Sequence, residues 1–587
     1  MRSQGKAVLI VLLILVAVVL AIGVSAVLML RGDSVVAKQT VLELDLTQAY
    51  PEYVPDDAFA RSLLDGRLRL RRVTELLDRA ASDDDIVGIV AKTGSVPMGL
   101  AAVQELRDAL TRFRASGKTM VAYAETFGEF GPSSGGYYLA SAFDRIYLQP
   151  SGDVGITGLS YEIPFAAETL EKLGLEPRLG RRHEYKNAVN TYTESEFTEA
   201  HEEAMQALVD SQFDQLVAGI ASARSLPPDE VRDVFDNGPY YGAEALDAGL
   251  VDGLAYRDEV YATLEEELGK DVTYLELDRY GGRRVELGER AKVALIYGVG
   301  GVVRGESRYD PMSGMLMGSE TVAKAFRSAV EDPEVDAILF RVNSPGGSYV
   351  ASDTIWRETV RSREAGKPVV VSMGNLAASG GYFVSMSADR IVAQPGTITG
   401  SIGVYGGKIV SQVLWKKLGV SWDAVESSPN ARMWSSLSDF DEQGWDRLQD
   451  SLDRIYDDFV SKVAEGRKLA REDVEAVAKG RIWTGEAALE HGLVDRLGGY
   501  PVALEEVRAV LGLAEDARLE LEVFPRPRST FELLVERLSS IGSPAPSPEL
   551  VKTLLGMAAQ IGQALRDLGI AGEGQGPLTA PGFESTP

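Results

Sequence analysis

The sequence predicts an α/β protein made of two copies of one domain, preceded by a single membrane-spanning helix. Three observations carry this prediction. Short apolar runs alternate with stretches of helical pattern, as in strands that are joined by crossover helices. Motifs recur at an interval of about 245 residues. An uncharged apolar segment lies close to the N-terminus.

The repeat is visible in both strand-like runs and loops. Ile86-Val-Gly-Ile-Val-Ala matches Val335-Asp-Ala-Ile-Leu-Phe at an offset of 249, and Ser134-Gly-Gly-Tyr-Tyr matches Ser379-Gly-Gly-Tyr-Phe at an offset of 245. Four extra residues therefore precede Ser134 in the first copy. A polar, glycine-containing stretch around 278–289 is typical of a linker, so we place the two domains at 34–287 and 288–525.

Length and composition limit the possible functions. A chain of 587 residues exceeds one ordinary hydrophobic core. A formal charge of −27 argues against nucleic acid as a partner, because phosphates would be repelled. The absence of cysteine excludes disulfides and a thiol nucleophile, and only His183, His201 and His491 could supply imidazole to a metal. We expect no metal and no organic cofactor.

The apolar segment Ala7 to Leu30 predicts an uncleaved membrane anchor. Its 24 uncharged residues can cross a hydrocarbon core of about 30 Å. A signal peptide cleaved after Ala26 is the rival interpretation, but the apolar run does not stop there. Arg2 and Lys6 precede the segment, so the positive-inside rule places residues 1–6 in the cytoplasm and the remainder outside it.

The C-terminal part, 526–587, has a different organisation. A proline-rich stretch at 541–548 predicts a stiff linker, and residues 549–568 carry apolar side chains at helical spacing. The last fifteen or so residues have a disordered composition. The helix could dock on its own chain, on a partner or on a membrane surface.

Two motifs predict a reactive serine that faces a glycine loop. Arg341-Val-Asn-Ser-Pro-Gly-Gly347 and Asn375-Leu-Ala-Ala-Ser-Gly-Gly-Tyr382 are expected at the ends of neighbouring strands. We predict that Ser379 is the nucleophile. The amide of Gly380, with that of Gly346 or Gly347, would donate hydrogen bonds to a developing oxyanion.

These two motifs, with Ile398-Thr-Gly-Ser-Ile-Gly-Val404, resemble the signal peptide peptidase A family, whose domains share the ClpP/crotonase fold. The similarity extends from about residue 41 to about residue 513. It implies a serine endopeptidase of the bacterial inner membrane that degrades cleaved signal peptides and other short or unfolded segments. It also implies a ring-like homo-oligomer, tetrameric in the tandem form.

The base that activates the serine is predicted to be a lysine. ClpP places a histidine about 25 residues after its serine, and this chain has none there. A buried lysine can act as a base, because desolvation lowers its pKa. The resemblance points to Lys186, in Glu184-Tyr-Lys-Asn-Ala-Val-Asn190, and to Ser401 as the residue that orients it.

The predicted site residues are divided between the copies. The second copy has Asn430 or Ala431 opposite Lys186, and the first copy has Ser95-Val-Pro-Met in place of the glycine loop and Ile156 in place of Ser401. We therefore predict one site, with Ser379 and Lys186 meeting across a domain interface. Three alternatives remain open: a second site of Ser134 and Lys186, a crotonase-like acyl-CoA enzyme, and a non-catalytic membrane scaffold.

Overall fold

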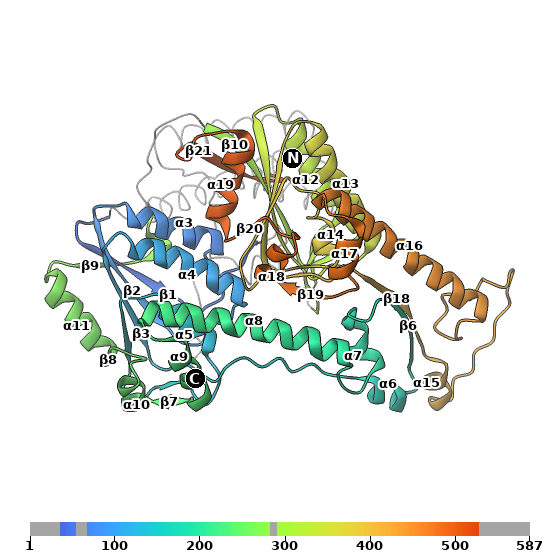
Figure 1. The fold of residues 1–587 in the computed structure, drawn as a ribbon, viewed down its shortest axis with the longest axis horizontal. Helices are drawn as coiled ribbons and strands as arrows, with labels where there is room; N and C mark the ends of the chain where they lie inside the picture. The colour runs from blue at the N-terminus through green and yellow to red at the C-terminus, as the bar shows by residue number, and fades with distance from the viewer. Residues whose placement is uncertain (1–35, 55–66, 282–289, 311, 527–587) are drawn as a thin grey trace, which may run out of the picture.

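The computed structural model describes residues 36–54, 67–281, 290–310 and 312–526. Within these residues the chain folds into two α/β halves, each built on a largely parallel sheet (Figure 1). The predicted duplicated α/β architecture is confirmed. The predicted boundary near residue 288 lies outside the described residues.

The sheet of the first half has the order β8-β4-β3-β2-β1-β9, and every neighbouring pair is parallel. Its strands are β1 (Thr40–Asp45), β2 (Ile86–Thr93), β3 (Thr119–Ala124), β4 (Arg145–Leu148), β8 (Gly253–Leu254) and β9 (Thr273–Glu276). Both faces are buried, which explains the continuous apolar runs. Leu42 and Ile89 face a core that includes α3 (Leu70–Ala81) and α4 (Leu100–Arg114), whereas Val41 faces α11 (Arg257–Leu268).

The sheet of the second half repeats this order as β20-β16-β15-β14-β10-β21. These strands are β10 (Arg290–Val299), β14 (Val335–Ser344), β15 (Val369–Ala378), β16 (Arg390–Ala393), β20 (Arg496–Leu497) and β21 (Arg518–Phe524). Two further strands, β17 (Ile398–Gly400) and β19 (Ile482–Thr484), extend it beyond β15. Helices α12 (Ser319–Glu331) and α13 (Tyr349–Glu364) cover one face, and α19 (Tyr500–Leu511) covers the other.

Segments of the first half extend onto the second half. Strand β6 (Glu176–Arg182) pairs antiparallel with β18 (Val404–Val410) of the second half. The long helix α8 (Glu199–Arg224) spans both halves in Figure 1, and its Gln212 donates a hydrogen bond to the carbonyl of Gly396 at 3.1 Å. The two halves are therefore joined by a shared sheet and by a shared helix.

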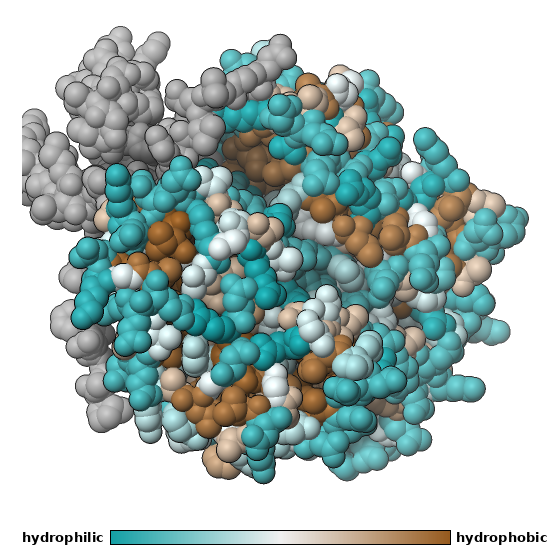
Figure 2. Space-filling view, turned by 60° about the vertical axis from the view of Figure 1, so that its left-hand side comes forward, coloured by the Kyte–Doolittle hydropathy of each residue, from teal (hydrophilic) through white to brown (hydrophobic). Residues whose placement is uncertain are grey.

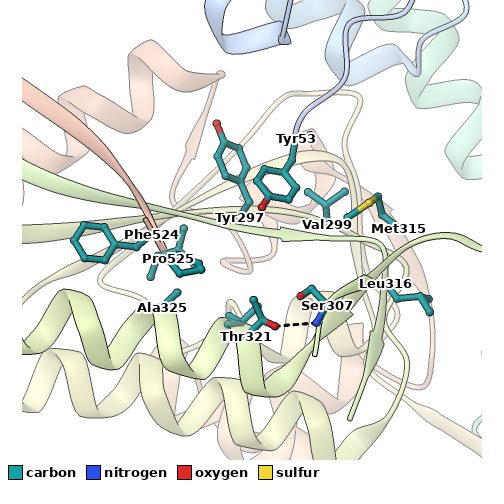
Figure 3. A pocket seen from close by; sticks show the side chains of 12 residues that line it. Tyr53, Tyr297, Val299, Ser307, Met315, Leu316, Thr321, Ala325, Phe524 and Pro525 are labelled. Atoms are coloured by element: carbon teal, nitrogen blue, oxygen red, sulfur yellow. Dashed lines mark hydrogen bonds between the residues drawn. The ribbon is translucent and has the colours of Figure 1, made fainter. Parts of the chain in front are cut away.

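A third contact between the halves is aromatic. Tyr53, from the segment after β1, stacks on Tyr297 of β10 with ring centroids 5.0 Å apart. The two rings lie beside a cavity of about 30 Å³ in the second half (Figure 3). The cavity can hold only one or a few water molecules, so it is not a substrate site.

A mainly hydrophilic surface is expected for a chain in which 25% of the residues are charged. The face drawn in Figure 2 is mainly hydrophilic, and its hydrophobic patches are separate from one another. Among the helices of the described part, none is sufficiently long and apolar to span a membrane. The predicted anchor at 7–30 and the predicted helix at 549–568 lie outside the described residues.

Candidate active site

Ser379 occupies a sharp turn between β15 and the short helix α14 (Gly380–Phe383). Its backbone has φ 54° and ψ −117°, a conformation that is costly for a residue with a side chain. The turn is held by the Ser379 amide, which donates to the carbonyl of Gly400 at 2.9 Å. A serine at a strained strand-to-helix turn projects its hydroxyl away from the sheet, as nucleophilic serines do in other hydrolases.

The glycine loop that follows β14 lies against this turn. A Cβ atom on Gly346 would lie 2.5 Å from the nitrogen of Gly380, so a larger residue would collide with the serine turn. The Gly346 amide donates to Ser344 Oγ at 3.2 Å. The amides of Gly347 and Gly380 have no acceptor among the described residues, which leaves these two free to bind an oxyanion.

Lys186 reaches the second half through the β6–β18 pair. Arg182, the last residue of β6, is opposite Val404, the first residue of β18. Lys186 follows four residues after Arg182, and Ser401 precedes Val404 by three. Antiparallel pairing therefore places the residue after one strand beside the residue before the other.

The Lys186 amine contacts both predicted serines. Its Nζ lies 3.0 Å from Ser379 Oγ, 3.0 Å from Ser401 Oγ and 3.0 Å from the Ser401 carbonyl oxygen. The residue is only 3% exposed, and among the described residues no carboxylate offsets the burial of its amine. Burial lowers the pKa of Lys186 to about 7. A neutral amine at this position can accept the Ser379 hydroxyl proton.

Sequence reasoning missed the segment that holds Lys186 and Ser401 together. The amides of His183 and Tyr185 donate to the carbonyl of Lys479, and the Ser401 amide donates to the carbonyl of Arg481 at 2.7 Å. Gly480 lies between Lys479 and Arg481 with φ 90°. A Cβ atom at this position would lie 2.5 Å from the backbone nitrogen of Lys186. This segment directly precedes 485–495, which repeats 242–252, and that repeat was the signal that could have drawn attention to it.

The first copy holds no comparable arrangement. Ser134 is buried, and its hydroxyl donates to the carbonyl of Gly158 at 2.9 Å. The lysine amine, in contrast, contacts Ser379. Ile156, the counterpart of Ser401, is fully buried in the core of the first half.

The three histidines lie in other environments. The ring of His183 packs against Tyr456 at 4.6 Å, and that of His491 against Trp483 at 4.3 Å. A ring nitrogen of His201 lies 3.3 Å from the side-chain amide of Asn190. Over the described ranges, no group of three or more potential ligands among His, Cys, Asp and Glu is arranged to bind a metal ion.

Comparison with known proteins identifies the family. The profile of peptidase family S49 matches residues 112–271 and 361–514, one region in each half. The chain belongs to peptidase family S49. Its serine protease activity follows from this family, and the acyl-CoA enzyme and the scaffold are not supported.

The relatives of this S49 chain cover most of its length. Protease 4 of Haemophilus influenzae is 31% identical over 520 residues, which are 84% of this chain and 81% of the relative. The chloroplastic serine protease SPPA of Arabidopsis thaliana is 29% identical over 82% of this chain and 71% of its own length. These matches confirm the resemblance to signal peptide peptidase A. A solved ClpP1 structure from Listeria monocytogenes aligns over 36% of this chain and 94% of its own, at 15% identity and a TM-score of 0.23.

Proposed function

We propose that this S49 protease cleaves peptides with Ser379 as nucleophile and Lys186 as general base. The observation that carries the proposal is the 3.0 Å contact between the Lys186 amine and the Ser379 hydroxyl inside a buried environment. A neutral Lys186 amine has two hydrogens, which it can donate to the carbonyl and hydroxyl oxygens of Ser401, so its lone pair is left for the Ser379 hydroxyl. Gly347 and Gly380 supply the oxyanion donors.

The reaction has two half-reactions that use the same groups. The neutral amine accepts the Ser379 proton while Oγ attacks the scissile carbonyl carbon, and the carbonyl oxygen becomes an oxyanion at the two glycine amides. Collapse of this intermediate breaks the C–N bond, and the lysine ammonium protonates the leaving amine. Water then gives a proton to the amine and attacks the acyl-enzyme, and Ser379 regains its proton as the acyl group leaves.

The proposed substrates are cleaved signal peptides and other short or unfolded segments. The family resemblance supports this class, because a short or unfolded segment can present an extended backbone to Ser379 and to the amides of Gly347 and Gly380. A folded protein would not present its backbone in this form. The site requires no metal or organic cofactor in this mechanism.

We also propose that the chain is anchored in a bacterial inner membrane by residues 7–30, with residues 1–6 cytoplasmic and both halves extracytoplasmic. The length of the apolar segment and the positions of Arg2 and Lys6 support this topology. An anchored protease would meet signal peptides where they are released. The third proposal is a homo-oligomer, a tetramer by family resemblance.

The duplication supports oligomer formation. Strand β6 of the first copy pairs with β18 of the second, and by the repeat offset of 245 their counterparts are residues 421–427 and 159–165. Residues 421–427 are all exposed, including Trp422 and Val425. A second copy of the chain could pair these two segments as β6 and β18 pair within one chain, and this contact would extend head to tail.

The proposed function is tested with full-length protein in vesicles and a synthetic signal peptide. Wild type is expected to cleave the peptide, while the Ser379→Ala variant leaves it intact and a folded globular protein is not degraded. Cleavage of the folded protein at a similar rate would contradict the substrate class. Cleavage of the peptide by the Ser379→Ala variant would contradict the assignment of the nucleophile.

A further inference from the structure

One helix of the first copy contacts the three segments that carry the second copy's site. Helix α4 lies between the first sheet and the second half (Figure 1). Its contacts are Ala102 N to Asn375 Oδ1 at 2.9 Å, Arg341 Nη2 to Glu105 Oε2 at 2.7 Å and Gly396 N to Gln104 Oε1 at 2.7 Å. Each partner precedes a site element by a few residues, because Asn375 leads to Ser379, Arg341 to the glycine loop and Gly396 to Ser401.

Arg341 is a fully buried cation whose partners come mainly from the first copy. Its guanidinium donates to Glu52 at 2.6 Å and to Glu105 at 2.7 Å, and to Ser372 of its own half at 2.7 Å. Burial raises the pKa of Glu52, although Arg341 opposes the shift. Buried charges require paired partners, so this cluster fixes the docking of the halves at the start of the glycine-loop motif.

The contact of Asn375 replaces a helix cap that the first copy lacks. In the second copy Ser348 caps its own helix α13, accepting a hydrogen bond from the Ala351 amide at 3.4 Å. The corresponding residue of the first copy is Gly99, which has no side chain to cap α4. Asn375, from the strand that carries Ser379, binds the corresponding amide, that of Ala102. The first copy's helix is therefore capped by the second copy.

The close approach at this contact depends on Gly99. A Cβ atom on Gly99 would lie 2.6 Å from Asn375 Oδ1. The loop Ser95-Val-Pro-Met-Gly99 stands where the second copy has its glycine loop, and it provides no free Gly-Gly amides. In this chain the end of the loop, at Gly99, instead packs against Asn375 of β15, the strand that leads to Ser379.

We propose that Asn375, supported by Arg341, is a positioning residue that uses α4 to hold Ser379 at its distance from Lys186. The inference rests on the proposed Ser379–Lys186 chemistry. Lys186 belongs to the first copy, so its distance from Ser379 depends on how the halves dock. The β6–β18 pair fixes the position of Lys186 relative to the second half. The contact of Asn375 with α4 fixes the position of Ser379 relative to the first half.

The first test is Asn375→Ala in the full-length protein with a fluorogenic peptide. A displaced serine lowers kcat about 10-fold to 100-fold and leaves KM within about twofold, because peptide binding is retained while the reacting atoms are misplaced. The control is Lys118→Met, which removes hydrogen bonds to the carbonyls of Ala80 and Asp83 within the first half. It should lower the melting temperature without changing kcat. Unchanged kcat in Asn375→Ala would overturn the proposal.

The second test separates positioning from helix capping. Gly99→Ser gives α4 its own cap but collides with Asn375, and we expect low kcat. The double variant Gly99→Ser with Asn375→Ala keeps a cap and removes the collision, yet it lacks the link between the copies. Low kcat in the double variant supports the proposal, whereas wild-type kcat would show that Asn375 only stabilises the helix.

The same assays on Lys186→Ala distinguish the positioning role of Asn375 from the role of Lys186 as the base. Lost turnover in Lys186→Ala with normal turnover in the Asn375 variants would overturn the positioning role alone. Full turnover in Lys186→Ala would overturn the proposed base. In that case the labelling rate of Ser379 by a fluorophosphonate still decides whether Asn375 positions the serine.

Discussion

The amine of Lys186 lies 3.0 Å from the hydroxyl of Ser379, although the two residues are 193 positions apart and belong to different copies of a duplicated domain. Lys186 is carried there by the β6–β18 strand pair, which joins the copies. The duplication thus gave the chain two equivalent scaffolds, of which one presents the serine and the other presents the lysine.

The first prediction concerns the side chain at position 186. Lys186→Ala and Lys186→Arg should both lower kcat by at least about 100-fold, because alanine has no base and arginine stays protonated at neutral pH. Peptide turnover measures this directly. Substantial activity in Lys186→Arg would show that another group accepts the serine proton.

The second prediction is the pH dependence of the rate. Only the neutral amine can accept a proton, and burial lowers the pKa of Lys186 to about 7. The value of kcat/KM should therefore rise through pH 7 and level off above about pH 8, provided that chemistry limits the rate. A profile that keeps rising to pH 10 would indicate a lysine with an ordinary pKa.

The third prediction concerns stability. The pKa of Lys186 falls from 10.5 to about 7 on folding, so between these values the unfolded chain binds more protons than the folded chain. The free energy of unfolding should rise with pH in this window, by at most about 1.4 kcal/mol per unit from this group. Below pH 7 the penalty is constant.

Lys186→Met isolates this contribution. The variant should be more stable than wild type at pH 7, and its advantage should shrink toward pH 10. Chemical denaturation of both proteins at several pH values provides the measurement. An advantage that does not change with pH would mean that Lys186 is not desolvated.

The fourth prediction concerns Gly480, whose φ is 90°. A Cβ atom added to it would lie 2.5 Å from the backbone nitrogen of Lys186. Gly480→Ala should displace Lys186 and lower kcat about 10-fold or more. The matched control is Gly366→Ala, at φ 80° with no atom within 4 Å, which introduces similar backbone strain without a collision. Equal kcat in both variants would show that Gly480 does not help to position Lys186.

Much of the architecture follows from local sequence patterns. Apolar runs such as Val369-Val-Val-Ser-Met read as a buried strand because both faces of a parallel sheet are covered. The repeat predicted two copies of one domain because similar sequences adopt similar folds. The division of the site was readable because Lys186 has no counterpart in the second copy, and the glycine loop none in the first.

The docking between the copies was not readable. The contacts of Asn375 with Ala102 and of Lys479 with His183 join residues more than 250 positions apart, and no local periodicity reports such pairs. The choice between Gly346 and Gly347 as oxyanion donor also needed coordinates. It depends on one hydrogen bond, from the Gly346 amide to Ser344 Oγ.

The most direct test of the central claim is mass spectrometry of the full-length protein after treatment with a fluorophosphonate. We predict a single adduct on Ser379, which is absent from Ser379→Ala, strongly reduced in Lys186→Arg and unchanged in Ser134→Ala. Ser134 lacks the loop amides, and loss of an oxyanion donor typically costs about 100-fold to 1000-fold in rate. An adduct on Ser134 comparable to that on Ser379, or full labelling of Ser379 in Lys186→Arg, would contradict a single site shared between the two copies.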